Sequence, residues 1–177
     1  MTWWRTEPTN GSADDLADAL AQPTALVLRA TIMGQLRLES QRKSPNETGG
    51  VLVGYVDENG RTVVTAVVGP GPNAVHSRSR FRRDGDYAQA EVDRLYHASK
   101  GRDDYVGEWH SHPDAGGPSF IDRGSMSWIS NNPSYGRPEP VLIIMERVRE
   151  PEWCPRAYRW VGRRLVEVGA SVTVTGC

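Results

Sequence analysis

The segment Tyr105-Val106-Gly107-Glu108-Trp109-His110-Ser111-His112-Pro113 predicts a short β-strand that ends at a pair of histidines. Side chains two positions apart on a strand point to the same face, about 6.6 Å apart along the chain. His110 and His112 can therefore converge on one metal ion if the strand ends or bends there. Pro113 cannot donate a hydrogen bond to a neighbouring strand, so we expect the strand to end at His112.

A third metal ligand is expected downstream, because a catalytic zinc site usually has three protein ligands and one open position. Asp122 is the nearest plausible carboxylate, and the small residues of the 114–118 spacer can turn the chain back toward the histidines. Ser119-x-x-Asp122 also resembles a helix capping box, which would explain both residues without a metal. The two interpretations are partly compatible, since a helix N-terminus can hold Asp122 in place.

The segments around this motif predict an α/β fold. Strands and helices intermix along the chain and hairpins are present, which favours a single domain with a mixed β-sheet flanked by helices. We expect a domain over residues 23–170, preceded by a polar lead (1–22) and followed by a tail (171–177). The predicted strands are 25–28, 50–56, 62–68, 105–110, 141–145, 157–161 and 164–168, and the predicted helices are 12–20, 31–42, 86–99 and 119–131.

Composition excludes several classes of function. The formal net charge of the 177 residues is −1, which predicts no general affinity for nucleic acid or an anionic membrane. Two cysteines outside any CxxC pair indicate no disulfide framework. No stretch approaches the roughly 20 apolar residues that span a bilayer, and we expect a cytoplasmic protein. The arginine run over residues 78–83 is the exception in charge: it could bind a phosphate or an acidic partner, although a solvated edge strand or loop is the commoner explanation.

Taken together, the two motif blocks resemble the JAMM metallopeptidase motif of the JAB/MPN family. The downstream block is the H-S-H-P of residues 110–113 followed by S-x-x-D at residues 119–122. Upstream, Glu47-Thr48-Gly49-Gly50-Val51-Leu52-Val53-Gly54 is similar to the family's E-x-G-G-x-L-x-G segment. The likeness covers roughly residues 25–165, and small bacterial members are the most similar. The spacer between His112 and Ser119 has six residues, where the eukaryotic pattern has seven.

The resemblance implies a fold and a set of residue roles. The fold would be a cytidine-deaminase-like mixed sheet, and the metal would be Zn²⁺ held by His110, His112 and Asp122. Glu47 would be the general base that accepts a proton from the attacking water and passes it to the leaving amine. Ser119 would donate a hydrogen bond to the developing oxyanion. General acid–base catalysis of this kind contributes about 10²–10⁴-fold in rate.

Three residues near the motif have alternative interpretations. Glu108 would point to the same strand face as both histidines and is an alternative base, although a role beside a histidine N–H is equally open to it. Trp109 and Trp128 could line the site, but tryptophans in such positions are more often part of the core. His76 lies outside both motifs and is given no role.

The family likeness predicts a zinc-dependent isopeptidase or peptidase that cleaves after the C-terminal glycine of a ubiquitin-like protein. Its substrate would be such a protein or its conjugate, and E1- and E2-like proteins would be functional partners, including those of bacterial antiphage systems. Processing of a ubiquitin-fold sulfur carrier is an alternative. A non-catalytic MPN scaffold is a second alternative, which the complete ligand set disfavours, and a DNA-repair role has only the arginine run behind it. The identity of the modifier, its linkage and the oligomeric state are not encoded in any motif.

Overall fold

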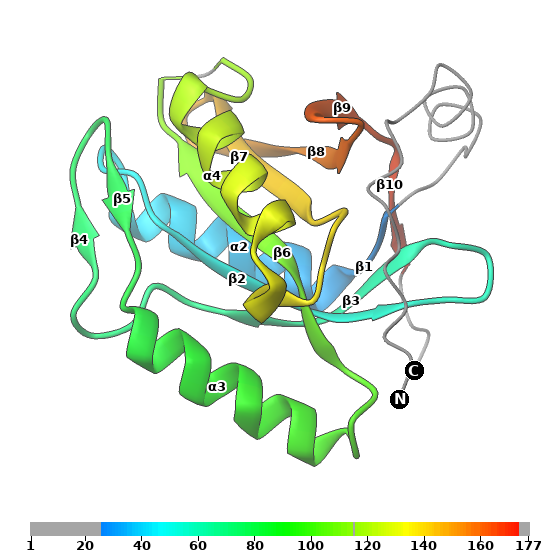
Figure 1. Cartoon of the computed structure of the whole chain (residues 1–177). Helices are drawn as coiled ribbons and strands as arrows, with labels where there is room; N and C mark the ends of the chain where they lie inside the picture. The colour runs from blue at the N-terminus through cyan, green and yellow to red at the C-terminus, as the bar shows by residue number, and fades with distance from the viewer. Residues whose placement is uncertain (1–25, 115, 174–177) are drawn as a thin grey trace, which may run out of the picture.

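The computed structural model describes residues 26–114 and 116–173, so the predicted lead and its helix at 12–20 lie outside the described residues. Eight strands of the described part form one mixed sheet (Figure 1). Their spatial order is β10 (Ala170–Thr173), β1 (Leu26–Arg29), β3 (Thr62–Val68), β2 (Gly49–Val56), β6 (Asp104–His112), β7 (Val141–Arg149), β8 (Glu152–Val161) and β9 (Arg164–Glu167). Strand β1 is parallel to β3 and β10, β6 is parallel to β7, and the remaining pairs are antiparallel.

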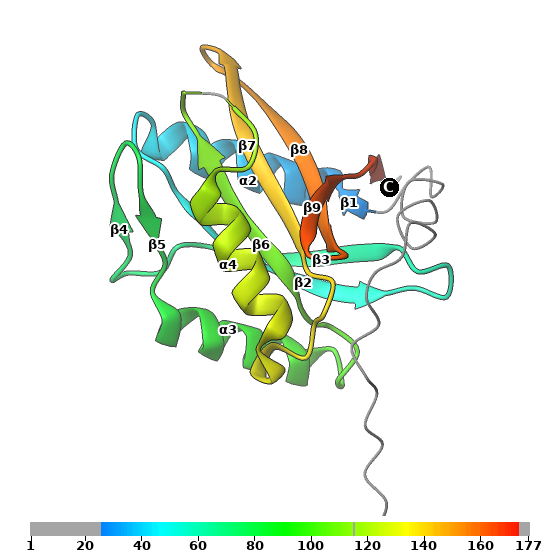
Figure 2. The ribbon, with the colours of Figure 1, turned by 45° about the horizontal axis from the view of Figure 1, so that its top comes forward.

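In the described part of the chain, three α-helices pack against the sheet. They lie on its two faces, as Figures 1 and 2 show. They are α2 (Ala30–Lys43), α3 (Gly85–Ala98) and α4 (Phe120–Asn131). Successive side chains of a strand point to opposite faces, and two apolar clusters follow from this alternation. Leu52, Trp109 and Ile143 pack with helix α2 on one face. Val51 and Ile144 pack with α3 and α4 on the other.

The central strands are buried on both faces, which explains their near-continuous apolar sequences. Strand β7 begins with five consecutive apolar residues, all almost completely buried. Glycine is required where β6 and β7 approach each other, because a Cβ at Gly107 would collide with the backbone carbonyl of Val141. The sheet therefore holds β6, the strand that carries the histidine pair, rigidly between β2 and β7.

The structure confirms the predicted mixed α/β fold and adds four features. The arginine run forms a small hairpin of β4 (Val75–His76) and β5 (Phe81–Arg82), and a 3-10 helix η1 (Pro133–Tyr135) follows α4. Strand β10 begins at the last residue of the predicted domain, continues into the segment assigned to the tail, and pairs with β1. Strand β7 runs four residues beyond the predicted strand 141–145. Among the described residues, no helix has the length and apolar character to cross a bilayer.

Two expectations for aromatic side chains are wrong. Trp128 was expected in the core, but it is 60% exposed on the outer side of α4, where its ring contacts Tyr135. Tyr87 and Tyr96 stand at roughly helical intervals with Val92 in the sequence, which predicts that they belong to the apolar face of α3, yet both lie near the surface. The buried stripe of α3 instead includes Ala88 and Val92, whose four-residue spacing turns them toward the sheet.

Candidate metal centre

Strand β6 places the two histidines on one face of the sheet. His110 and His112 point toward the side covered by α4, and Ser111 between them points to the opposite side and is completely buried. The Ser111 hydroxyl oxygen accepts a hydrogen bond from the N–H of Thr48 (3.0 Å), and its own N–H donates to the carbonyl of Thr48 (2.8 Å). These bonds fix the histidine strand beside the segment that contains Glu47. The strand ends at His112, as Pro113 predicts.

The three predicted ligands converge. The Nε2 atoms of His110 and His112 are 2.9 Å apart. The Asp122 carboxylate lies 3.3 Å from the His110 Nε2 and 3.7 Å from the His112 Nε2. Each of the three side chains is only 13–14% exposed. Two imidazole nitrogens and one carboxylate oxygen therefore face a common point from three directions.

Helix α4 begins so that its first turn presents Asp122 to the histidines. Ser119 is the N-cap, and its hydroxyl oxygen accepts a hydrogen bond from the Asp122 N–H (3.2 Å). The Asp122 carboxylate in turn accepts the N–H of Ser119 at 2.6 Å. The capping box and the ligand set are thus both present, and the cap orients the carboxylate.

Protonation states at the site suit a divalent metal. Burial would raise the pKa of Asp122, but hydrogen bonds from His110 and Ser119 outweigh it and hold that pKa far below its usual range. Burial lowers the pKa of His112, and the neighbouring His110 lowers it further. The His112 Nδ1 lies 3.2 Å from the carbonyl oxygen of Gly116; because a carbonyl only accepts, that nitrogen carries the proton and Nε2 keeps its lone pair. A metal ion binds ionised carboxylates and neutral imidazoles, and the pKa shifts of Asp122 and His112 favour those forms.

Residues of this cluster fit a zinc ion by their donor chemistry. Two histidines and one carboxylate are the ligand types of catalytic zinc sites, and three protein ligands leave a fourth position open. Within the described residues, the His110, His112 and Asp122 group is the one whose His, Cys, Asp and Glu ligand atoms all lie within 4.8 Å of one another.

Glu47 lies at the same cleft, immediately before strand β2. Its N–H donates to the carbonyl of Ser77 (2.8 Å), and its carbonyl oxygen lies 3.0 Å from the Nδ1 of His76. Burial raises the pKa of the Glu47 carboxyl; His110 partly offsets this, and the negative charge of Asp122 reinforces it. A carboxylate with a raised pKa beside the ligands is suited to accept and return a proton.

Glu108, the alternative base, is engaged elsewhere. One carboxylate oxygen pairs with the Arg83 guanidinium at 2.6 Å, and the other accepts the Tyr105 hydroxyl at 2.9 Å. Arg83 also donates to the Tyr135 hydroxyl of η1 (3.2 Å). Both oxygens of Glu108 therefore serve a polar network in the floor of the cleft.

The cleft containing these groups has a volume of about 700 Å³. One wall is the β4–β5 hairpin, the opposite wall is helix α4, and the floor is strand β6. Ser119 is exposed at the cleft, and its hydroxyl proton is still available because the oxygen only accepts in the cap. A shallower hollow, lined in part by Trp128 and Tyr135, shares Arg83 with the cleft. Tyr135 of η1 therefore lies at the edge of the site.

Two contacts of this site were missed from the sequence. His76 was given no role, yet it bonds to the backbone of Glu47, and Arg83 neutralises Glu108. The arginine run was visible in the sequence. Which of its members faces a carboxylate depends on how the β4–β5 hairpin folds over β6.

Comparisons with known proteins agree with this geometry. The family described as prokaryotic homologues of the JAB domain matches residues 29–161. A probable metalloprotease of Sinorhizobium fredii, y4qB, is 33% identical over 144 residues, which cover 80% of this chain and 85% of the relative. Two proteins named CD-NTase/cGAS isopeptidase are also similar. The one from Escherichia coli is 32% identical, covering 73% of this chain and 77% of its own, and the one from Enterobacter hormaechei is 35% identical, covering 68% and 66%.

A solved structure shares the fold. The solution structure of a Desulfitobacterium hafniense protein superposes with a TM-score of 0.65 at 18% identity, covering 85% of this chain and 94% of that one. At this identity the likeness bears on the arrangement of helices and strands alone, and it agrees with the mixed sheet described above.

Proposed function

This chain belongs to the prokaryotic homologues of the JAB domain and is a hydrolase of that family, and from this premise we propose that it is a zinc-dependent isopeptidase. Its substrate would be a protein conjugate in which the C-terminal glycine of a ubiquitin-like modifier is joined to an amine. The observation that carries the proposal is the convergence of His110, His112 and Asp122 beside Glu47 in one cleft. The names of the isopeptidase relatives support a conjugate as substrate, with a CD-NTase as one candidate component of it.

Each residue has a proposed task in amide hydrolysis. His110, His112 and Asp122 would hold the ion; when bound, zinc supplies Lewis-acid polarisation of the carbonyl and eases deprotonation of water. Glu47 takes the proton of the attacking water and returns it to the leaving amine. The Ser119 hydroxyl donates to the oxygen of the scissile carbonyl as negative charge develops there. Glu108 stays paired with Arg83 and does not exchange protons with the substrate.

The setting of the reaction is part of the proposal. Conjugation of a ubiquitin-like protein requires E1- and E2-like enzymes, so we propose these as functional partners in the same cell, and the cytoplasm as the place of action. Cleavage of a modifier precursor would use the same chemistry on a linear peptide bond, and the metalloprotease relative is compatible with it.

A trapping experiment tests the proposal. Glu47→Gln protein and wild type are each recovered from the native host with their bound proteins, which are then analysed by mass spectrometry, and zinc content is measured on both. We expect Glu47→Gln to keep zinc and to retain a protein with an isopeptide-linked C-terminal glycine that the wild type has released.

The matched control is Glu58→Gln, which changes an exposed glutamate in the β2–β3 turn. It should behave as the wild type. Recovery of an uncleaved precursor alone would favour linear processing over deconjugation. Full activity of the Glu47→Gln variant would refute the assignment of the base.

A further inference from the structure

The β4–β5 hairpin carries positive charge that no described carboxylate neutralises. Arg78, Arg80 and Arg82, here called the arginine rim, are exposed and line the cleft. None of the ion pairs among the described residues involves them. In a chain of net charge −1, three such arginines on one short hairpin are a local concentration of charge.

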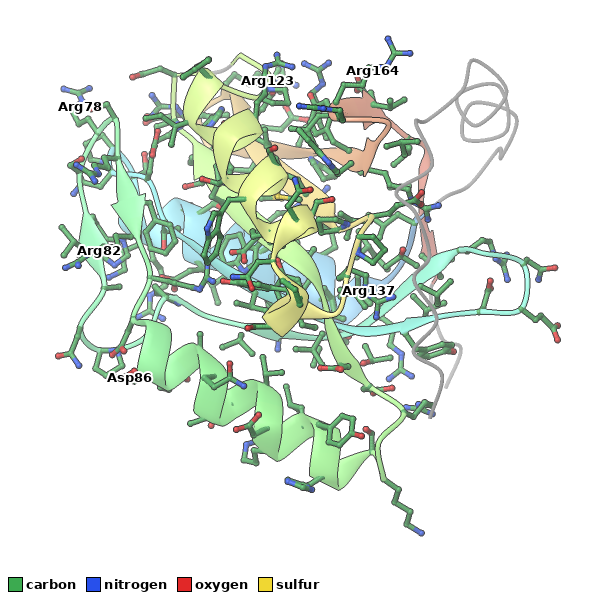
Figure 3. All side chains as sticks on the ribbon, viewed as in Figure 1. Arg78, Arg82, Asp86, Arg123, Arg137 and Arg164 are labelled. Carbon is green, nitrogen blue, oxygen red and sulfur yellow. The ribbon has the colours of Figure 1, made fainter. Side chains whose placement is uncertain are left out.

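The fourth arginine of the run shows that this charge is unevenly distributed. Arg83 is 26% exposed and is neutralised by Glu108 in the cleft floor. Figure 3 shows Arg78 and Arg82 on the side of the hairpin away from α4. The floor of the cleft is therefore electrically balanced, whereas its outer edge at the hairpin is positive.

The inner side of the hairpin is tied to the base of the reaction. Ser77 and His76 hydrogen-bond the backbone of Glu47, and the Phe81 ring lies against His76 with centroids 5.4 Å apart. A Cβ at Gly49 would also collide with Phe81. The hairpin is thus a fixed wall of the cleft, and the guanidinium groups lie along its outer edge, beside the cleft mouth.

We infer that the arginine rim binds acidic side chains of the substrate, in the part of the conjugate that lies outside the cleft mouth. This inference rests on the proposed function, because it names the class of substrate that the same site selects. Arginine matches carboxylates by charge and by its fork of N–H donors. A substrate with a basic flank is repelled by the same three charges, so the rim discriminates as well as binds.

Nucleic acid is the other polyanion that arginines bind, and the hairpin is poorly built for it. Proteins that hold single strands usually combine a basic groove with aromatic rings on which bases stack. The ring of the hairpin, Phe81, packs inward against His76 and Gly49. The whole chain, these three arginines included, has a net charge of −1, so the small positive patch has no support from the rest of the chain.

Binding of three fluorescent peptides tests the inference without any need for turnover. All three peptides end in Gly-Gly. Before these glycines, one alternates serine with glutamate, one alternates serine with lysine, and one contains serine alone. Fluorescence anisotropy measures their affinity for the Glu47→Gln protein. The rim is altered by Arg78→Glu, Arg80→Glu and Arg82→Glu together, and a milder variant has glutamine at the same positions.

The control reverses the same number of exposed arginines elsewhere, at Arg37 and Arg42 of α2 and Arg164 of β9, so that the net charge changes equally. Exposed ion pairs contribute about 0.2–1 kcal/mol each, so three predict roughly tenfold tighter binding of the glutamate peptide than of the serine peptide. The preference should vanish in both rim variants and at about 1 M salt, where the Debye length falls to about 3 Å, and persist in the control.

Three outcomes would overturn the inference: equal affinity for the glutamate and serine peptides, an equal loss in the control variant, or tighter rim-dependent binding of an oligothymidine. Because the readout is binding, it stands even if the trapping experiment finds no conjugate. With a cleavable conjugate, the rim variants should raise KM about tenfold for an acidic substrate and leave kcat unchanged.

Discussion

Removing Arg83 should destabilise the protein through the carboxylate that it leaves behind. The Arg83→Met variant keeps most of the side-chain volume but leaves Glu108 without its counter-ion in the floor of the cleft. Losing one partner of a fully buried ion pair costs about 3–5 kcal/mol. Here the side chains are 26% and 13% exposed, and the Tyr105 hydroxyl still donates to Glu108. Partial solvation and this remaining bond lower the expected cost to about 2 kcal/mol.

A second substitution separates this mechanism from simple loss of packing. Glu108→Gln in the Arg83→Met background removes the uncompensated charge, so the double variant should be more stable than Arg83→Met alone. For a chain of this size, about 2 kcal/mol corresponds to a fall in Tm of roughly 4–8 °C. The double variant should recover much of that fall, because the two residues are coupled.

Thermal and urea unfolding of the two single variants and the double variant measure the coupling. Arg94→Met is the matched control, since Arg94 pairs with Glu91 on the exposed side of α3, where solvent screening leaves the pair with little effect on stability. If Arg83→Met behaves like Arg94→Met, or if the losses of the single variants simply add in the double variant, the account of the ion pair is refuted. Glu108→Gln alone should keep zinc, as Glu47→Gln does, but unlike Glu47→Gln it should retain catalysis.

Three further changes test other parts of the structure. Ser119→Ala removes the N-cap of α4 and should lower the free energy of unfolding by about 1 kcal/mol. The same change removes an oxyanion donor, so kcat should fall about 10²–10³-fold with metal content unchanged. An unaltered kcat would confine Ser119 to capping. In the metal-free protein, the urea midpoint should fall as the pH drops below about 6.5, because the pKa of His112 is lower in the folded chain than its ordinary value. It should fall again below about pH 3.8, because the pKa of Asp122 is also lower in the folded chain. A urea midpoint that stays constant from pH 7 to 3 would contradict this. Gly107→Ala should lower the free energy of unfolding by about 2–3 kcal/mol, because the added Cβ meets the backbone of β7. Gly34→Ala, which adds a Cβ in open space on α2, should instead raise it by about 0.5–1 kcal/mol. Comparable unfolding free energies of the two variants would argue against the tight β6–β7 contact.

Much of the fold follows from local patterns in the chain. The Asn59-Gly60 turn and the two β-branched runs beside it predict the β2–β3 hairpin, because the turn geometry requires a positive φ and Gly60 adopts one (74°). Pro113 ends β6, and Ser119 begins α4, each by its own hydrogen-bonding properties. These signals need no partner from a distant part of the chain, and for that reason they can be recognised in isolation.

Other features depend on contacts between segments that are far apart in sequence. Trp109 and Trp128 look alike in the sequence, but the first is buried against α2 and the second is exposed on α4. The β4–β5 hairpin was expected as no more than a loop or an edge strand, because its pairing is only two residues long and depends on packing against Glu47 and Gly49. Strand β10 likewise exists through its pairing with β1.

The residue types of the metal centre were determined by the sequence itself, through the spacing of His110, His112 and Asp122 and the likeness of the motif to its family. Tertiary structure decided which carboxylate can act beside them. Glu47 and Glu108 both lie close to the histidines once the chain has folded, and no local pattern separates them. Burial raises the pKa of both carboxyls. The fold holds both oxygens of Glu108 against Arg83 and Tyr105, whereas the hydrogen bonds of Glu47 within the described residues are made by its backbone. A carboxylate held by a guanidinium stabilises the floor of the cleft, and a half-buried one beside the candidate metal ligands is available to move a proton.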